Sequence, residues 1–167
     1  MPEVISVDKQ DKEIGVGDKL KVHQDDTLHR AFSVLVFNSK GELMLQKRSK
    51  EKPIGCLLWS NTCCSHPRPN ENIKKEAEKR LKEEMGFTCD LKETFSLYYN
   101  LQYGFLFEHE FDHVFIGKYD GKANLDKKEA CDWKWISKED LIQDTKQNPE
   151  KYTGWLLLVV EKLFGLK

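Results

Sequence analysis

Between residues 73 and 85 the sequence places an apolar side chain at every fourth position, and a glycine follows the last: Ile73, Ala77, Leu81, Met85 and then Gly86. An α-helix turns by about 100° per residue, so this spacing aligns the four side chains along one face. Pro69 and Asn70 lead into the segment, and a glycine just past the last apolar position is typical of a helix C-cap. The pattern predicts a helix of roughly four turns that packs one face on a core and ends at Gly86.

Several segments around this helix are typical of strands. The expected strands are Ala31–Phe37, Glu42–Arg48, a segment near Thr94–Tyr103, Phe107–Gly117 and the short Asp132–Ile136. A turn at residues 38–41 makes the first two a hairpin. Ser137 with Asp140 resembles a capping box that opens a helical C-terminal part, in which Trp155–Val160 is the longest apolar run. A mixed sheet packed between helices buries all of this, so we predict an α/β fold of the α+β kind.

Length and charge exclude several classes of protein. The 167 residues show no internal repeat or linker and are enough for one compact domain, so residues 1–167 are predicted to be a single domain. The formal net charge of -1 gives no overall attraction to nucleic acid or to an anionic membrane surface. We therefore expect neither as a partner. Any recognition of phosphate must come from a few well-placed cations.

Compartment and redox state follow from the termini and the cysteines. Met1–Glu13 is rich in charge, which is not typical of a secretory signal, and the longest apolar run is far below the ~20 residues of a membrane span. The five cysteines are an odd number: Cys56, Cys63, Cys64, Cys89 and Cys131. Without a secretory signal, reduced thiols in a cytoplasmic protein are the expected state.

Two charged residues interrupt the apolar face of the predicted helix. Glu84 and Arg80 each project within about 20° of Ile73, where apolar residues are expected. One interpretation is an ion pair between neighbouring turns at the edge of the core. The other is functional: Glu84 faces a buried metal, and Arg80 beside it faces an anionic group.

Two short motifs bring together residue types that can perform chemistry. In Cys63-Cys64-Ser65-His66, an extended chain places Cys64 and His66 on one face and Cys63 on the other. In Glu108-His109-Glu110, the same alternation pairs the two glutamates and directs His109 away. Adjacent carboxylates on an inner face require a cation or a shared proton, whereas on an outer face they would be ordinary solvated charges.

Two further histidines precede the first predicted strand, at His23 and His29. Each alone is more often a surface residue than a ligand. Together with His66, Glu108 and Glu110 they supply three imidazoles and two carboxylates, which suit a divalent ion such as Mg²⁺, Mn²⁺ or Zn²⁺.

The order of these motifs resembles that of the type I isopentenyl-diphosphate isomerases. The similarity runs over roughly residues 8 to 160 and includes the following segments: Glu13-Ile14-Gly15, Asp18-Lys19, His23, His29-Arg30-Ala31-Phe32, Asn61-Thr62-Cys63-Cys64-Ser65-His66-Pro67, Lys82-Glu83-Glu84-Met85-Gly86, Glu108-His109-Glu110 and Trp155. One such match arises easily by chance, but the five motifs from His23–Phe32 to Trp155, all in the same order, do not. The resemblance implies a metal-dependent enzyme that interconverts isopentenyl and dimethylallyl diphosphate.

The helix also resembles a Nudix box, which implies a Nudix-like fold. Counted back from Gly86, the chain keeps Glu71, Leu81, Glu83 and Glu84 but has Lys79-Arg80 in place of the box's Arg-Glu. A hydrolase needs carboxylates there to hold metal against the scissile phosphate, whereas a cation holds a diphosphate intact. A Nudix pyrophosphohydrolase is the first alternative function, and a non-enzymatic metal-binding or scaffold domain is the second.

The resemblance implies a role for each candidate residue. Catalysis is assigned to Cys64 and Glu110 on opposite faces of the substrate, to Tyr98 hydrogen-bonded near Glu110, and to Trp155 facing the carbocation. Substrate binding is assigned to Lys19, Arg48, Lys52 and Arg80. The metal ligands are His23, His29, His66, Glu108 and Glu110 for a first divalent ion (Mg²⁺, Mn²⁺ or Zn²⁺), and Glu84 for a Mg²⁺ that bridges the diphosphate.

The remaining expectations concern the choice of tyrosine, the cofactors and the assembly. After Tyr98 the family has a basic residue and then alanine, but this chain has Tyr99-Asn100, so Tyr99 and Tyr103 stay open as alternatives. Cys56-Leu57 replaces the family's Pro-Gly before Trp59. We expect no flavin, an isoprenoid diphosphate as the substrate, and a monomer or weak dimer.

Overall fold

The helix expected before Gly86 is α2, Ile73–Met85, in the computed structural model, which describes residues 2–166. The Asn72 side chain caps its first turn by accepting a hydrogen bond from the Lys75 N–H. Gly86 ends the helix in the left-handed conformation, with φ of 79°. A side chain there would also meet the Asn124 carbonyl oxygen at 2.4 Å, so both backbone conformation and space call for glycine. The predicted helix and its end are confirmed.

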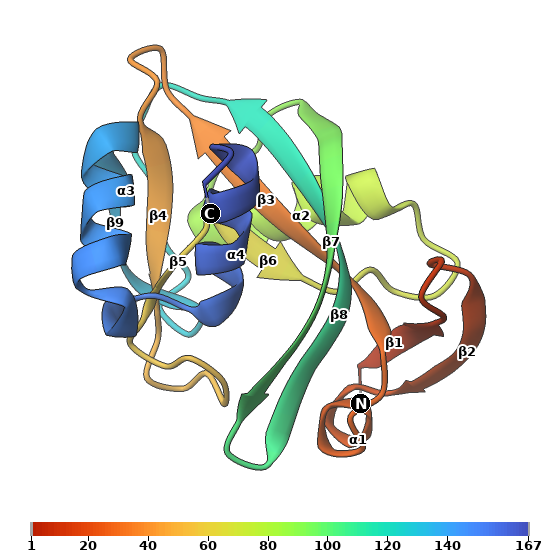
Figure 1. Cartoon of the computed structure of the whole chain (residues 1–167). Helices are drawn as coiled ribbons and strands as arrows, with labels where there is room; N and C mark the ends of the chain where they lie inside the picture. Colours follow the sequence, from red (N-terminus) through yellow and green to blue (C-terminus); the bar gives the residue numbers. More distant parts are fainter. Residues whose placement is uncertain (1, 167) are drawn as a thin grey trace.

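The strands of the described residues form one nine-stranded mixed sheet (Figure 1). They are β1 (Glu3–Val7), β2 (Glu13–Asp18), β3 (His29–Phe37), β4 (Leu43–Arg48), β5 (Trp59–Ser60), β6 (Cys63–Ser65), β7 (Leu91–Tyr103), β8 (Leu106–Lys118) and β9 (Ala130–Ile136). All five predicted strands are present, with ends that differ by a few residues. Sequence reasoning missed β1 and β2, which form an antiparallel hairpin at the N-terminus.

Strand β3 pairs with four other strands and so brings distant segments of the chain together. It runs parallel to β8 and antiparallel to β1, β4 and β6. The register pairs His29 with Glu110 on the β8 side and Ser33 with Cys64 on the β6 side. Three of the segments singled out in the sequence therefore meet at one strand.

Helices cover both faces of the sheet. On one face, Phe32, Val34 and Val36 of β3 pack with Ala77 and Leu81 of α2. On the other face, residues of β3, β4 and β8 pack against α3 (Lys138–Gln147) and α4 (Gly154–Leu163), as Figure 1 shows. Burial on both faces explains why β3 is almost continuously apolar rather than alternating.

The remaining elements are short. Ser137 caps α3 by accepting a hydrogen bond from the Asp140 N–H, as predicted, and a 3-10 turn at Pro149–Lys151 leads to α4. Helix α1 (Lys19–Gln24) follows the β1–β2 hairpin and lies beside β8 in Figure 1. Within residues 2–166, every helix is too short or too polar to cross a bilayer.

Candidate active site

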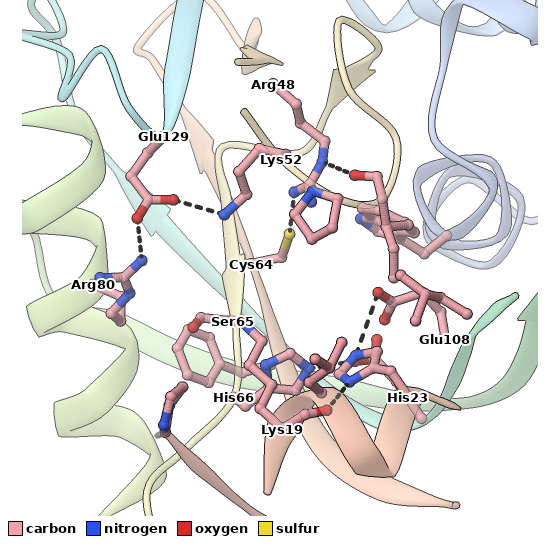
Figure 2. Close-up of a pocket in the computed structure, with 18 residues that line it drawn as sticks. Lys19, His23, Arg48, Lys52, Cys64, Ser65, His66, Arg80, Glu108 and Glu129 are labelled. Carbon is pink, nitrogen blue, oxygen red and sulfur yellow. Dashed lines mark hydrogen bonds and ion pairs between the residues drawn. The ribbon is translucent and has the colours of Figure 1, made fainter. Parts of the chain in front are cut away.

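A pocket of about 310 Å³ opens between α1, β6, β8 and the start of α4. Figure 2 shows its lining residues, which include ten of the candidates: Lys19, His23, Arg48, Lys52, Cys64, His66, Arg80, Glu108, Glu110 and Trp155. These residues come from segments more than 130 positions apart in the chain. Of the other candidates, His29 and Glu84 are buried and do not line the pocket, and Tyr98 is exposed outside it.

Five side chains form a group that could hold a metal ion: His23, His29, His66, Glu108 and Glu110. One ligand atom from each lies within 4.8 Å of all the others. The Nδ1 atoms of His23 and His29 donate to the carbonyls of Lys19 and Thr27, at 2.6 and 2.9 Å. Those bonds fix each ring so that the other nitrogen, Nε2, faces the group with its lone pair available when the imidazole is neutral.

Within this group His66 Nε2 lies 2.8 Å from Glu110 Oε2, but another inward-facing nitrogen lacks a partner, which suits a cation. Nε2 of His29 is buried without a hydrogen-bond partner, although Glu110 Oε2 lies 3.2 Å away. Burial and the nearby charge of Glu110 raise the pKa of Glu108. Burial opposes ionisation of Glu110 too, but the nearby imidazole of His29 and the hydrogen bond from Tyr99 prevail and lower its pKa. Three imidazoles and two buried carboxylates are a donor set that fits a divalent ion.

The two adjacent cysteines point to opposite faces of β6, as the alternation predicts. Cys63 is buried in the core against α2, whereas Cys64 lines the pocket with His66. Burial raises the pKa of the Cys64 thiol to about 12, although Arg48, with Nη1 3.7 Å from the sulfur, works in the other direction. The Cys64 thiol is therefore protonated near neutral pH and can donate a proton.

The expectation that Tyr98 lies near Glu110 is wrong, and its neighbour Tyr99 takes that place. Tyr98 is 47% exposed and hydrogen-bonds His109 on the outer face of the sheet. The Tyr99 hydroxyl is buried 2.7 Å from Glu110 Oε1 and 3.1 Å from Asp112 Oδ2. In the register of β7 with β8, Tyr99 stands opposite Glu110 and Tyr98 opposite Phe111, so a shift of one residue changes the face.

Glu110 therefore belongs to a buried polar cluster that sequence reasoning did not find. Asp112 accepts a hydrogen bond of 2.7 Å from the Ser33 hydroxyl, and burial raises its pKa well above the usual range. Alternation along β8 places Asp112 on the same face as Glu110, which was the available signal. His109 lies on the other face, as predicted, and binds Asp26, and His113 on the same outer face binds Asp11.

Four cations line the same pocket, namely Lys19, Arg48, Lys52 and Arg80. Burial, and then the charge of Lys52, lower the pKa of Lys19. Lys52 and Arg80 share the carboxylate of Glu129, a residue that no motif marks and that sequence reasoning missed. Figure 2 shows Glu129 between Lys52 and Arg80.

Glu84 is paired within the protein. It is 2% exposed, and its carboxylate accepts hydrogen bonds from Arg80 Nη2 at 2.9 Å and from Gln46 Nε2 at 3.1 Å. The ion pair that was one interpretation of the helix is therefore present, and Glu84 lies outside the five-residue group. Its role toward a Mg²⁺ stays a prediction.

Trp155 forms part of the pocket wall from the first turn of α4. It is 3% exposed, and its indole N–H donates to Asn61 Oδ1 at 3.2 Å. The guanidinium of Arg48 lies over the ring, with Cζ 5.1 Å from the ring centroid. The ring thus already holds one cation close to its π-system.

Comparison with solved structures shows the fold. DR0079 from Deinococcus radiodurans superposes with a TM-score of 0.82 at 15% identity, over 96% of this chain and 98% of that one. A MutT protein from Methanosarcina mazei gives a TM-score of 0.61 at 21% identity, over 70% of this chain and 81% of that one. The NUDIX domain family matches residues 27–156. The predicted Nudix-like α+β fold is confirmed.

Curated relatives are similar over nearly the whole chain. Isopentenyl-diphosphate Delta-isomerase 2 of Aromatoleum aromaticum is 46% identical over 99% of this chain and 88% of its own length. Isopentenyl-diphosphate Delta-isomerase of Serratia proteamaculans is 44% identical over 96% of this chain and 90% of its own length. The chain belongs to the NUDIX domain family and, within it, to the isopentenyl-diphosphate Delta-isomerases.

Proposed function

We propose that this protein interconverts isopentenyl diphosphate and dimethylallyl diphosphate. The observation that carries the proposal is the meeting of Cys64 and Glu110 in one pocket, with Trp155 in its wall and four cations among its lining residues. An alkene is a very weak base, and the tertiary carbocation formed by its protonation would react with water. The reaction therefore needs a proton donor, a proton acceptor and a closed, electron-rich site.

The described residues can supply each proton transfer. In one direction, the Cys64 thiol gives its proton to the terminal alkene carbon, and Glu110 removes a proton from the carbon on the other side of the cation. The π-system of Trp155 stabilises the positive charge, by about 2 kcal/mol at a desolvated site. Tyr99 takes the role that was first assigned to Tyr98, because its hydroxyl lies beside the carboxylate that changes protonation.

The cations hold the diphosphate away from this chemistry. Lys19, Arg48, Lys52 and Arg80 provide positive charge along the pocket wall, and Arg guanidinium groups suit bidentate contacts to phosphate. Glu84 would hold a Mg²⁺ near the diphosphate, and the three histidines with Glu108 and Glu110 would hold the other divalent ion. When bound, these ions supply positive charge that neutralises phosphate and stabilises the ionised form of Glu110.

We also propose that residues 1–167 act as a single domain and as a monomer or weak dimer. One sheet connects β1 to β9, which supports the single domain. Light scattering after gel filtration tests the assembly.

An isomer-exchange assay tests the function. The purified protein is incubated with isopentenyl diphosphate and Mg²⁺ without flavin, and dimethylallyl diphosphate is followed by NMR. Cys64→Ala serves as the inactive control, and released phosphate is measured in parallel. Formation of the isomer with background phosphate release supports the proposal. Hydrolysis of nucleoside diphosphate derivatives with no isomerisation would replace it with a Nudix pyrophosphohydrolase.

A further inference from the structure

Glu129 is an anion that lies between two of the cations in the pocket lining, Lys52 and Arg80. It lies just before β9, and its two carboxylate oxygens are each bound to a different cation. Oε2 accepts a hydrogen bond of 2.7 Å from Lys52 Nζ, and Oε1 accepts one of 3.1 Å from Arg80 Nη2 (Figure 2). Burial opposes ionisation of Glu129, but Lys52 and then Arg80 prevail and lower its pKa to about 2. The carboxylate is therefore charged throughout the physiological range.

Arg80 is shared between Glu129 and the carboxylate behind it. The same Nη2 atom that binds Glu129 also donates to Glu84 Oε1, at 2.9 Å. Two carboxylates from different elements thus share one guanidinium nitrogen, in addition to Lys52 on Glu129 and Gln46 on Glu84. Glu84 is almost fully buried, so water cannot readily replace the Arg80 guanidinium as a partner of its carboxylate.

A diphosphate needs the cations that these carboxylates already bind. If Lys52 and Arg80 turn toward phosphate oxygens, Glu129 and Glu84 keep negative charge beside a polyanion without an adequate partner. Repulsion between like charges is strong in a partly buried pocket. A divalent cation that prefers oxygen ligands neutralises this excess negative charge, because it can bind carboxylate and phosphate oxygens together.

We propose that Glu129 is a specificity-determining residue for the part of the pocket around Lys52 and Arg80. It makes this part accept a diphosphate together with a divalent cation in preference to the metal-free diphosphate. The inference rests on the proposed function for the location of the diphosphate. Glu129 acts in the opposite direction to Lys52 and Arg80. It weakens binding of the metal-free diphosphate, so that the complex of diphosphate with metal is selected.

Calorimetric titration with inorganic pyrophosphate tests this inference without any isomerase assay. The affinity is measured for the full chain with excess Mg²⁺ and with EDTA, before and after Glu129→Gln. In the parent chain we expect Mg²⁺ to tighten binding by about tenfold or more. In Glu129→Gln we expect metal-free pyrophosphate to bind about tenfold more tightly than in the parent, so that the advantage given by Mg²⁺ falls below about threefold.

Two further variants serve as matched controls. Glu83 also binds Arg80, at 2.6 Å from Nη1, but it lies outside the pocket that holds Glu129. Glu83→Gln should leave both affinities within about twofold of the parent. Lys52→Met should weaken binding in both conditions and retain the advantage of Mg²⁺, and it provides a second test if Glu129→Gln does not fold.

The outcomes separate this inference from the proposed function. If the parent binds pyrophosphate but Glu129→Gln leaves the Mg²⁺ advantage unchanged or weakens metal-free binding, the inference is wrong and the site remains a diphosphate site. Loss of the Mg²⁺ advantage in Lys52→Met would also overturn it. If the parent binds pyrophosphate in neither condition, the proposed diphosphate site fails and the inference fails with it.

Discussion

Tyr99 donates a hydrogen bond of 2.7 Å to Glu110 from the directly opposite position on the neighbouring antiparallel strand. Both residues point into the interior, so the hydroxyl and the carboxylate are held together by the register of the sheet. Tyr98 occupies the outer face and contacts His109 instead. The pair gives a direct test of which tyrosine supports catalysis.

Tyr99→Phe should lower kcat for isomerisation by about 10- to 100-fold, because a hydrogen bond to a charged group contributes about 1.5–3 kcal/mol. Tyr98→Phe removes the same hydroxyl from the outer face and should leave kcat within about twofold. The comparison uses steady-state kinetics of both variants. A larger loss in Tyr98→Phe would mean that the register of β7 with β8 is wrong.

The two adjacent cysteines provide a second matched pair. Cys64→Ala should reduce turnover by about 10²–10⁴-fold, the usual contribution of a positioned acid or base. Cys63→Ala should keep most of the activity and lower the thermal midpoint, because Cys63 is fully buried in the core. Isomer exchange and thermal unfolding of both variants check the prediction, and equal losses of activity would contradict it.

Metal content should depend on the inner histidines and not on the outer ones. Alanine at His23, His29 or His66 removes one ligand from the group around Glu110 and should lower the metal bound per chain. His109→Ala and His113→Ala are the controls, since both rings lie on the other face of β8 and bind acidic side chains there. Elemental analysis of the purified variants measures the metal bound per chain. A lower metal content in His109→Ala would contradict the assignment of the five-residue group around Glu110 as the metal site.

Arg80 and Trp155 should affect different kinetic constants. Arg80→Ala should mainly raise KM, roughly tenfold, because a contact to the diphosphate is equally present in the ground and transition states. Trp155→Leu should instead lower kcat by roughly 30-fold, equivalent to ~2 kcal/mol of cation–π stabilisation, and Trp155→Phe should lower it less. If Trp155→Leu changed KM alone, the ring would be a binding surface and not a stabiliser of the cation.

Glu129 should make stability depend on pH in the acid range. Its pKa in the folded protein is about 2, below the ordinary value of 4.5, so the unfolded chain binds more protons between these two values. The stabilisation is fully present above about pH 4.5 and is lost as the pH falls toward 2. The difference in free energy of unfolding between the parent and Glu129→Gln should therefore shrink across that window. Urea unfolding at several pH values measures it, and a difference that stays constant would contradict the assignment.

The sequence alone determined the features that depend on local periodicity. Apolar spacing and Gly86 located α2 and its end, and alternation placed Cys64 with His66 and Glu108 with Glu110. These predictions held because the direction of a side chain relative to its near neighbours follows from the backbone geometry of one element. The motifs in their order also indicated the family.

Only the tertiary structure decided which elements face one another. The choice of Tyr99 over Tyr98 depends on the register between two strands, and a shift of one residue reverses the face. Glu129 carries no motif, yet the fold brings it to Lys52, 77 residues away in the chain, and to Arg80, 49 residues away. Charge interactions act through space and not along the chain, so the partners of an isolated glutamate are set by the packing of distant segments.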